Sequence, residues 1–147
     1  MAPKKERPSA KEYRKLPIEG EFAAVRLSPE ADAAYKAICA GKDALSVKRR
    51  TVLNRYMLEF CASKVLRLND QHFKKEETFS VGKGKRVAIF AFKAWKWRLY
   101  GALMTIDGVR TFVGVKVDED KKQDKANRTL MKSAADAISE LEEHDDR

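Results

Sequence analysis

Three β-rich runs follow one another between Lys85 and Val117, and they constrain the fold more than any other feature of the chain. The runs read KRVAIFAFK, KWRLYGALMTI and RTFVGVKV. Asp107-Gly108 separates the second run from the third, and both residues tolerate the positive φ angles of a tight turn, which predicts a hairpin. We therefore expect an antiparallel meander of three strands.

Shorter signals before and after this block predict the remaining elements. The apolar run EFAAVRL predicts a strand over Glu21–Leu27. Ser28-Pro29-Glu30 predicts the start of a helix, because Ser caps it, Pro fits its first position and Glu suits its first turn; Gly41 offers its end. We also expect a longer helix over 46–68, a polar loop over 69–84 with a strand start near Phe79, and a last helix over 124–142.

The order of these elements indicates the fold class. Strand, helix, helix, three strands and helix make an α+β fold of order β-α-α-β-β-β-α, in which the first strand joins the meander in a small, mostly antiparallel sheet. The two successive helices form a hairpin that is expected to pack against one face of this sheet. The other face is expected to stay partly open.

The length of 147 residues allows one domain with loose ends. Residues 1–20 lack hydrophobic periodicity and are expected to form a flexible basic arm, residues 21–142 the domain, and residues 143–147 an acidic tail. Cys39 and Cys61 follow no apolar leader, which argues against a disulfide framework, and no window approaches about 18 apolar residues. We therefore expect a cytoplasmic protein with no membrane partner.

The net charge of +9 is concentrated in one segment. Residues 78–117 contain eight Lys or Arg and a single acid, Asp107, whereas residues 118–147 contain six Lys or Arg and ten acids. Concentrated positive charge favours polyanionic partners and speeds their capture, although it carries no sequence specificity. A nucleic acid, and RNA in particular, is the expected partner of the β-rich block.

Cations and aromatic rings alternate in the segment FKAWKWRLYG, residues 92–101. Single-stranded nucleic acid needs both, cations for its phosphates and flat rings for its bases. If the strand registers align, alternation places four of the candidates on one face of the sheet. Those four are Arg86, Arg98, Tyr100 and Lys116, and the other candidates are Lys93, Trp95 and Lys96.

A simpler interpretation of the same residues is that the cations are solvated on the outer face of a half-buried sheet and the rings belong to the core. Trp97 shares its predicted face with Leu99 and is expected in the core. Trp95 lies at a predicted turn, where either interpretation holds.

Metal and nucleophile sites are not expected. His72 and His144 lie far apart without ligand-like spacing to the cysteines, and neither cysteine neighbours an activating group. The segment Gly82-Lys83-Gly84 lacks the spacing and the Lys-Ser/Thr ending of a phosphate loop. We therefore predict neither a metal nor a cofactor.

Three segments together resemble a known family. FAAVRLSPEADAAYKAI runs from a strand into a capped helix, FAFKAWKWRLYG is similar to a paired-strand motif with basic and aromatic residues, and the last strand runs into VDEDKKQDKA before the terminal helix. In this order the chain resembles the RelE/ParE superfamily of toxins from bacterial type II toxin–antitoxin systems, including the HigB-like branch, over residues 21–141.

The resemblance implies a small toxin neutralised by a cognate antitoxin, and in the RelE-like branch a ribosome-associated endoribonuclease that cuts mRNA without a metal. By position in the motifs it implies catalytic roles for Arg98, Tyr100, Lys121 and Lys122 and an RNA-binding role for Lys125, with Arg86 a weaker match. Two alternatives stay open: a ParE-like toxin that binds DNA gyrase, and a noncatalytic RNA- or DNA-binding protein of the same architecture.

Such a cleavage has a simple physical route. A base takes the proton of the 2′-OH, the 2′-oxygen attacks the adjacent phosphorus, cations stabilise the extra negative charge and an acid protonates the leaving 5′-oxygen. A lysine can be that base only if its pKa is lowered, which neighbouring cations promote. Tyr100 is expected to position or exchange a proton.

Overall fold

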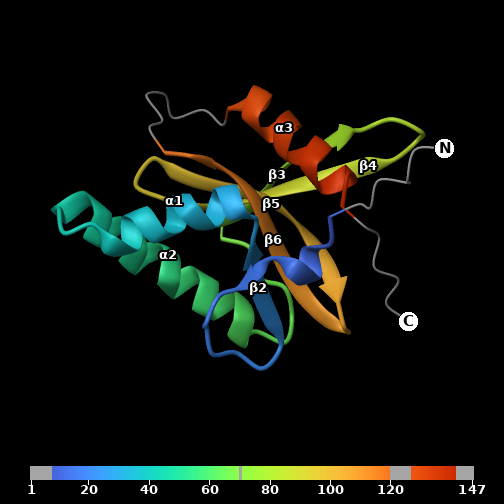
Figure 1. Ribbon diagram of the computed structural model, residues 1–147. Helices are drawn as coiled ribbons and strands as arrows, with labels where there is room; N and C mark the ends of the chain where they lie inside the picture. Colours follow the sequence, from blue (N-terminus) through green and yellow to red (C-terminus); the bar gives the residue numbers. More distant parts are fainter. Residues whose placement is uncertain (1–7, 70, 120–126, 142–147) are drawn as a thin grey trace.

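The computed structural model describes residues 8–69, 71–119 and 127–141 and shows an α+β fold (Figure 1). The described strands form one sheet on which helices pack. In chain order the elements are η1, a 3₁₀ helix (Ala10–Glu12), β1 (Arg14–Lys15), β2 (Ala23–Leu27), α1 (Pro29–Ala40), α2 (Ala44–Ala62), β3 (Phe73–Ser80), β4 (Arg86–Ala94), β5 (Trp97–Ile106), β6 (Val109–Asp118) and α3 (Arg128–Ser139).

The sheet contains six strands within the described residues, in the order β1-β2-β6-β5-β4-β3. β4, β5 and β6 are antiparallel neighbours, which confirms the predicted meander, and β2 pairs with β6 in parallel. β3 was expected to be mostly loop; it is instead a full strand along the edge of β4. The sheet is therefore larger than the sequence predicts, but it is mostly antiparallel as expected.

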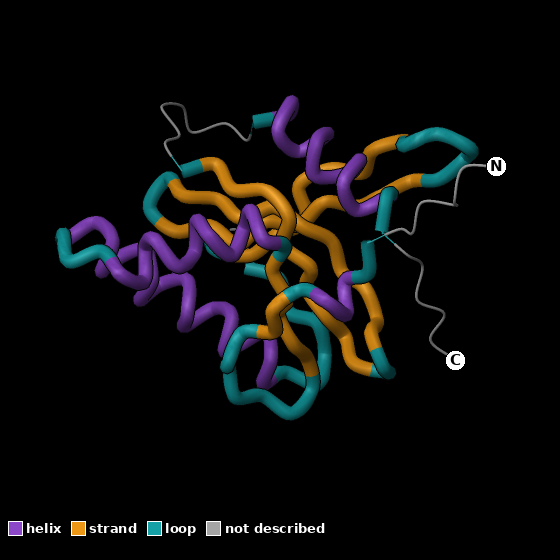
Figure 2. The backbone as a smooth tube through the Cα atoms, in the orientation of Figure 1, coloured by secondary structure: helices purple, strands orange, loops and turns teal. Residues whose placement is uncertain are grey.

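Helices cover both faces of this sheet (Figures 1 and 2). The hairpin of α1 and α2 packs on one face, over a core that includes Phe92, Trp97 and Phe112. α3 packs on the opposite face, over a core that includes Ile89 and Tyr100. The prediction of a partly open face is therefore wrong over the middle of the sheet, where α3 lies.

The helix starts follow from local chemistry. The hydroxyl oxygen of Ser28 accepts a hydrogen bond from the backbone N–H of Ala31, and Pro29 occupies the first turn of α1. Asp43 caps α2 and Asn127 caps α3 in the same way. The two helices of the hairpin are therefore well delimited, although α2 ends at Ala62, several residues before the predicted end.

Two irregularities decide which side chains share a face. In β3 the register against β4 shifts between Lys75 and Glu77, and along β5 the register against β6 shifts between Tyr100 and Gly101. An extra residue in one strand bends it and moves the following side chains to the other face. A Cβ on Gly101 would lie 2.1 Å from the carbonyl oxygen of Val113, so the second irregularity requires glycine.

Part of the predicted flexible arm joins the fold. Within residues 8–20, η1 buries Ala10 completely, β1 pairs with β2, and Leu16 is buried in the core. The guanidinium of Arg14 donates to both carboxylate oxygens of Asp32, at 2.8 to 3.0 Å. The sequence predicted a flexible arm because single apolar residues such as Ala10 and Leu16, spaced among charged residues, give no periodic pattern.

Cys39 is exposed, Cys61 is buried, and both are unpaired, as expected. Burial raises the pKa of the Cys61 thiol to about 11, so it behaves as a small apolar core residue. None of the described helices is long and apolar enough to cross a membrane.

Candidate functional site

Charged side chains gather on the α3 side of the sheet, near the turn between β4 and β5. Lys93 of β4 is the cross-strand partner of Arg98 in β5, and Arg98 is in turn the partner of Asp118 in β6. Cross-strand partners project on the same side of a sheet, so these three share a face. We call these residues, together with Lys74 and Glu76 of β3, the charged cluster.

Glu76 is the most unusual member of the charged cluster. It occupies the irregularity of β3, and its side chain is only 6% exposed. Its Oε1 atom lies 3.7 Å from the ammonium of Lys93, whose side chain is 15% exposed, and its Oε2 atom lies 3.9 Å from that of Lys74. These are ion pairs beyond hydrogen-bond length, and among the described residues Oε1 has no hydrogen-bond partner. A buried carboxylate oxygen is thus left able to accept a proton or a hydrogen bond.

Lys93 is electrostatically perturbed. Burial lowers its pKa most, and the positive charges of Lys74 and Arg98 lower it further, while the carboxylate of Glu76 opposes the shift. An ammonium whose pKa is lowered gives up its proton more readily. The pair of Lys93 and Glu76 therefore offers a proton donor and a proton acceptor at one place.

Tyr100 lies in the core and not on an open face of the sheet. It is completely buried, and its hydroxyl oxygen accepts a hydrogen bond from the backbone N–H of Asn127 at 3.2 Å. Burial raises the pKa of its hydroxyl, against the smaller lowering effects of the Asn127 bond and of Arg98. Proton exchange with RNA requires an accessible hydroxyl, and the side chain of Tyr100 is instead enclosed in the core on the α3 side of the sheet.

Lys116 is only partly gathered into this region. It lies opposite Tyr100 in the ladder, as the predicted common face requires. Its ammonium, however, pairs with the carboxylate of Glu30 in the first turn of α1, at 3.2 Å. Lys116 adds to the positive potential near the charged cluster, but its ammonium forms an ion pair with α1.

Arg86 does not join the others. It pairs with Ser80 at the far end of β4, seven residues from Lys93, a separation of about 23 Å along a strand. Alternation along β4 also directs Arg86 to the face of Phe90 and Phe92, which the helical hairpin covers. Its predicted place in the cluster is therefore wrong.

The two tryptophans separate as their positions suggest. Trp97 is completely buried in the core under the helical hairpin, as predicted. Trp95 lies in the β4–β5 turn with Lys96 and is 54% exposed. Lys121, Lys122 and Lys125 lie outside the described residues.

Sequence reasoning missed Glu76 and Lys74, because it assigned their segment to a loop. The available signal was the pair Phe73 and Phe79, which bracket a run of charged residues as the ends of a strand do. They are six residues apart, which predicts one common face, yet Phe73 packs under the helical hairpin and Phe79 under α3. The irregularity at Glu76 makes this possible.

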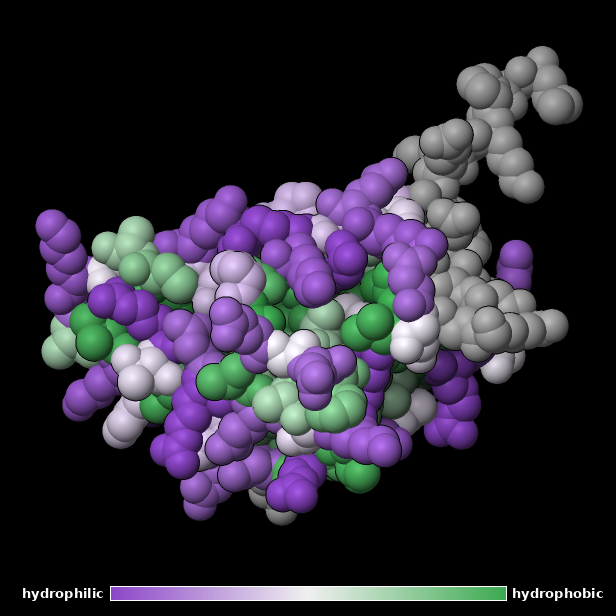
Figure 3. Space-filling view, turned by 90° about the horizontal axis from the view of Figure 1, so that it is seen from below, coloured by the Kyte–Doolittle hydropathy of each residue, from purple (hydrophilic) through white to green (hydrophobic). Residues whose placement is uncertain are grey.

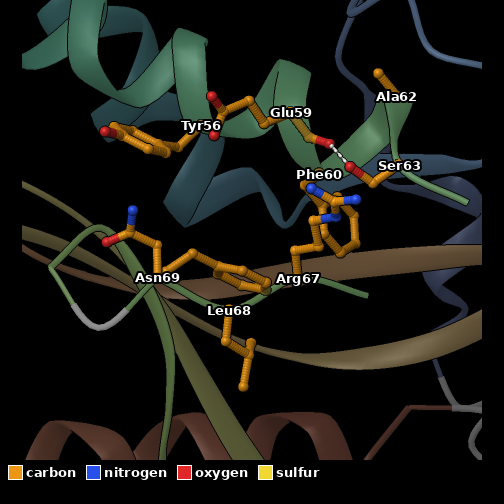
Figure 4. Close-up of a pocket in the computed structure, with 9 residues that line it drawn as sticks. Tyr56, Glu59, Phe60, Ala62, Ser63, Arg67, Leu68 and Asn69 are labelled. Atoms are coloured by element: carbon orange, nitrogen blue, oxygen red, sulfur yellow. Dashed lines mark hydrogen bonds between the residues drawn. The ribbon is translucent and has the colours of Figure 1, made fainter. Parts of the chain in front are cut away.

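A cavity of about 410 Å³ lies near the end of α2 and is a second candidate site (Figure 4). Glu59 and Arg67 are its charged residues, and the rings of Phe60 and Phe73 are aromatic members of its lining. The described residues that line it are Tyr56, Glu59, Phe60, Ala62, Ser63, Arg67, Leu68, Asn69 and Phe73. The charged cluster contains the buried ion pair of Glu76 and Lys93 and is the stronger candidate for chemistry.

Exposed apolar residues lie on α2 and the segment that follows it. Leu58, Val65 and Leu68 are exposed large apolar residues of α2 and the following segment. In the view from below, green apolar residues are interspersed with purple polar ones (Figure 3). Scattered apolar residues of this kind are ordinary on protein surfaces.

Among the described residues, no group of three or more His, Cys, Asp or Glu is arranged to hold a metal ion. Comparisons with protein-family models, with curated proteins and with solved structures find no match to this chain.

Proposed function

We propose that this chain is a RelE-like toxin that cleaves mRNA by attack of a 2′-OH on the adjacent phosphate. The observation that carries the proposal is the pair of Lys93 and Glu76, a buried acid and a lysine with a lowered pKa, set beside Arg98 in the most basic part of the sequence. A lysine with a lowered pKa beside a buried carboxylate is typical of acid–base sites.

The proposed step uses these groups in complementary roles. The carboxylate of Glu76 accepts the proton of the 2′-OH, the 2′-oxygen bonds to phosphorus, and the ammonium of Lys93 gives its proton to the leaving 5′-oxygen. The products are a 2′,3′-cyclic phosphate and a 5′-OH end. Arg98 stabilises the negative charge that develops on the phosphate oxygens.

The topology supports the same proposal. The order β2, α1, α2, β4, β5, β6, α3 is compatible with the β-α-α-β-β-β-α order expected of RelE-like proteins, with β1 and β3 added at the two edges of the sheet. The resemblance in the segment from Phe90 to Gly101 falls on the β4–β5 hairpin, which carries Lys93 and Arg98.

Induced expression in a bacterium tests the proposal directly. We expect growth arrest, loss of intact mRNA and fragments with 5′-OH ends. Glu76→Gln and Arg98→Ala should each lower the cleavage rate by about 10²- to 10³-fold. Arg55→Ala is the matched control, since it removes one positive charge from an exposed site on α2 and should cleave normally.

The outcomes separate the proposal from its alternatives. Growth arrest with intact mRNA and altered DNA supercoiling would replace it with gyrase binding. Normal growth without an antitoxin would leave a noncatalytic nucleic-acid-binding protein. Full cleavage by Glu76→Gln would reject the assignment of the acid–base pair.

A further inference from the structure

The turn between β4 and β5 carries an unusual residue at its tip. Trp95 and Lys96 both have positive φ angles, 47° and 63°. Two-residue hairpin turns of this kind are normally built from Asn and Gly, because a bulky side chain is strained there. Trp95 is also 54% exposed, although its ring is the largest apolar surface a residue can offer. Neither backbone preference nor core packing explains a tryptophan at this position.

Two cations of α2 hold this turn from the side. The Nε atom of Arg49 donates a hydrogen bond to the backbone oxygen of Trp95 at 3.0 Å. The ammonium of Lys48 lies 5.2 Å from the centre of the indole ring, which is a cation–π contact. Lys96 adds a third positive charge in the turn itself. One cation therefore lies over the ring, a second binds the backbone of the turn, and a third belongs to the turn itself.

The turn borders the charged cluster. Lys93 and Arg98 face each other two rungs before the turn, with the pair of Ala94 and Trp97 between them. Two rungs correspond to about 7 Å along the hairpin. In Figure 1 the β4–β5 turn lies at the same end of the molecule as the beginning of α2. The charged cluster lies on the α3 face of the sheet and Lys48 lies on α2, which covers the opposite face, so a nucleic-acid strand with a phosphate at Arg98 reaches Lys48 by passing around the end of the β4–β5 hairpin.

We propose that Trp95, with Lys48, Arg49 and Lys96, is a platform on which one unpaired base of a single-stranded RNA stacks. The ring supplies the stacking surface, and the surrounding cations face the adjoining phosphates. The inference rests on the proposed function for the choice of RNA, and it adds a binding subsite on α2 and the turn, outside the charged cluster. Base stacking would explain why a tryptophan occupies this exposed position in spite of its positive φ angle.

Binding of an RNA that cannot be cleaved tests the platform independently of catalysis. The probe is a single-stranded RNA oligonucleotide with 2′-O-methyl groups throughout, titrated against the full chain while tryptophan fluorescence is followed. Wild type should show quenching of the exposed Trp95 on binding, because Trp97 is completely buried and out of reach. An unquenched wild type would overturn the proposal.

Variants of the turn separate the ring from the fold. Trp95→Asn removes the ring and suits the positive φ angle, so it should unfold no more easily than wild type, yet bind about 5- to 100-fold more weakly. Trp95→Tyr keeps a stacking ring and should retain most of the affinity. Lys48→Met should reduce the slope of affinity against salt by about one ion.

Two results would overturn the platform whatever happens to cleavage. One is unchanged RNA affinity of Trp95→Asn, which would leave a protein partner as the ligand of the turn. The other is equal dependence on Trp95 for single-stranded probes and for duplex probes closed by a loop at each end, since a base inside a duplex is covered by its neighbours and cannot stack on the ring. Conversely, weak binding by Trp95→Asn in a protein that never cleaves RNA would support the platform and reject only the proposed chemistry.

Discussion

Removing the charges of Glu76 and Lys93 singly and together should reveal how strongly this ion pair is coupled. The two atoms that form it are 3.7 Å apart, and the side chains are 6% and 15% exposed. Unit charges about 4 Å apart attract by about 4 kcal/mol at an effective dielectric constant of about 20, and by about 1 kcal/mol in water. Because the separation exceeds hydrogen-bond length, we expect a coupling energy of about 2–4 kcal/mol between Glu76→Gln and Lys93→Met.

The chain offers a control pair with nearly the same geometry. Arg55 and Glu59 of α2 are 3.8 Å apart, but their side chains are 70% and 58% exposed. Exposed pairs at this helical spacing contribute about 0.3–0.5 kcal/mol. The same cycle with Arg55→Met and Glu59→Gln should therefore give several-fold less coupling, and the difference isolates the effect of burial.

Urea unfolding of the four proteins in each cycle, followed by circular dichroism at pH 7, measures both coupling energies. The pH dependence adds an independent check. Between the lowered pKa of Lys93 in the folded protein and its ordinary value of 10.5 in the unfolded chain, the unfolded chain binds more protons, so raising the pH stabilises the fold. Glu76→Gln removes the carboxylate that holds the proton on Lys93, so the stability lost in this variant should shrink as the pH rises toward the lowered pKa of Lys93, because the attraction disappears when the ammonium loses its proton. Equal coupling in the two cycles would refute the conclusion that burial strengthens the ion pair of Glu76 and Lys93.

Three further results are expected. Gly101→Ala should lower the free energy of unfolding by about 3 kcal/mol, because its Cβ would meet the Val113 carbonyl oxygen, and a loss under about 1 kcal/mol in urea unfolding would contradict this. Burial raises the pKa of Tyr100, so the free energy of unfolding should fall as the pH rises above about 10. In urea unfolding from about pH 8 to 11, Tyr100→Phe should make this decrease smaller, and an equal decrease in the two proteins would argue against it. The hydrogen bond from Arg14 lowers the pKa of Asp32, so the stabilisation by this ion pair is present above about pH 3.8 and is lost as the pH falls through the lower pKa of the folded state. Asp32→Asn should therefore lower the free energy of unfolding by about 1–3 kcal/mol at pH 7, and an unchanged urea midpoint would contradict this.

The elements with strong local signals could be predicted from the sequence. Ser28 and Pro29 start α1 where expected, since capping and proline geometry depend only on neighbouring residues. Asp107 and Gly108 both have positive φ angles in the turn between β5 and β6, as the hairpin signal required. The meander followed from these signals together with the β-branched and aromatic composition of the strands.

The acid of the candidate site could not be predicted, because its position depends on a register irregularity. Strand alternation places Phe73 and Phe79 on one face of the sheet. The charged residues between them show no alternation with apolar residues, so they are typical of a solvent-exposed loop. One inserted residue in β3 changes the face and places Glu76 beside Lys93 of the next strand. That contact depends on pairing across strands, which single-sequence patterns do not encode.

The position of the terminal helix follows from the strands, which are apolar on both faces of the sheet. In β4, Ile89 and Ala91 are completely buried on one side and Phe92 on the other, so both faces of the sheet are apolar. A sheet with two apolar faces needs a covering layer on each, and the helical hairpin can cover only one. α3 covers the second face, and its cap residue Asn127 donates its backbone N–H to the hydroxyl of Tyr100. Tyr100 therefore marks the edge of the covered area, and the chemistry is expected two residues before it in β5, at Arg98, where the charged cluster begins.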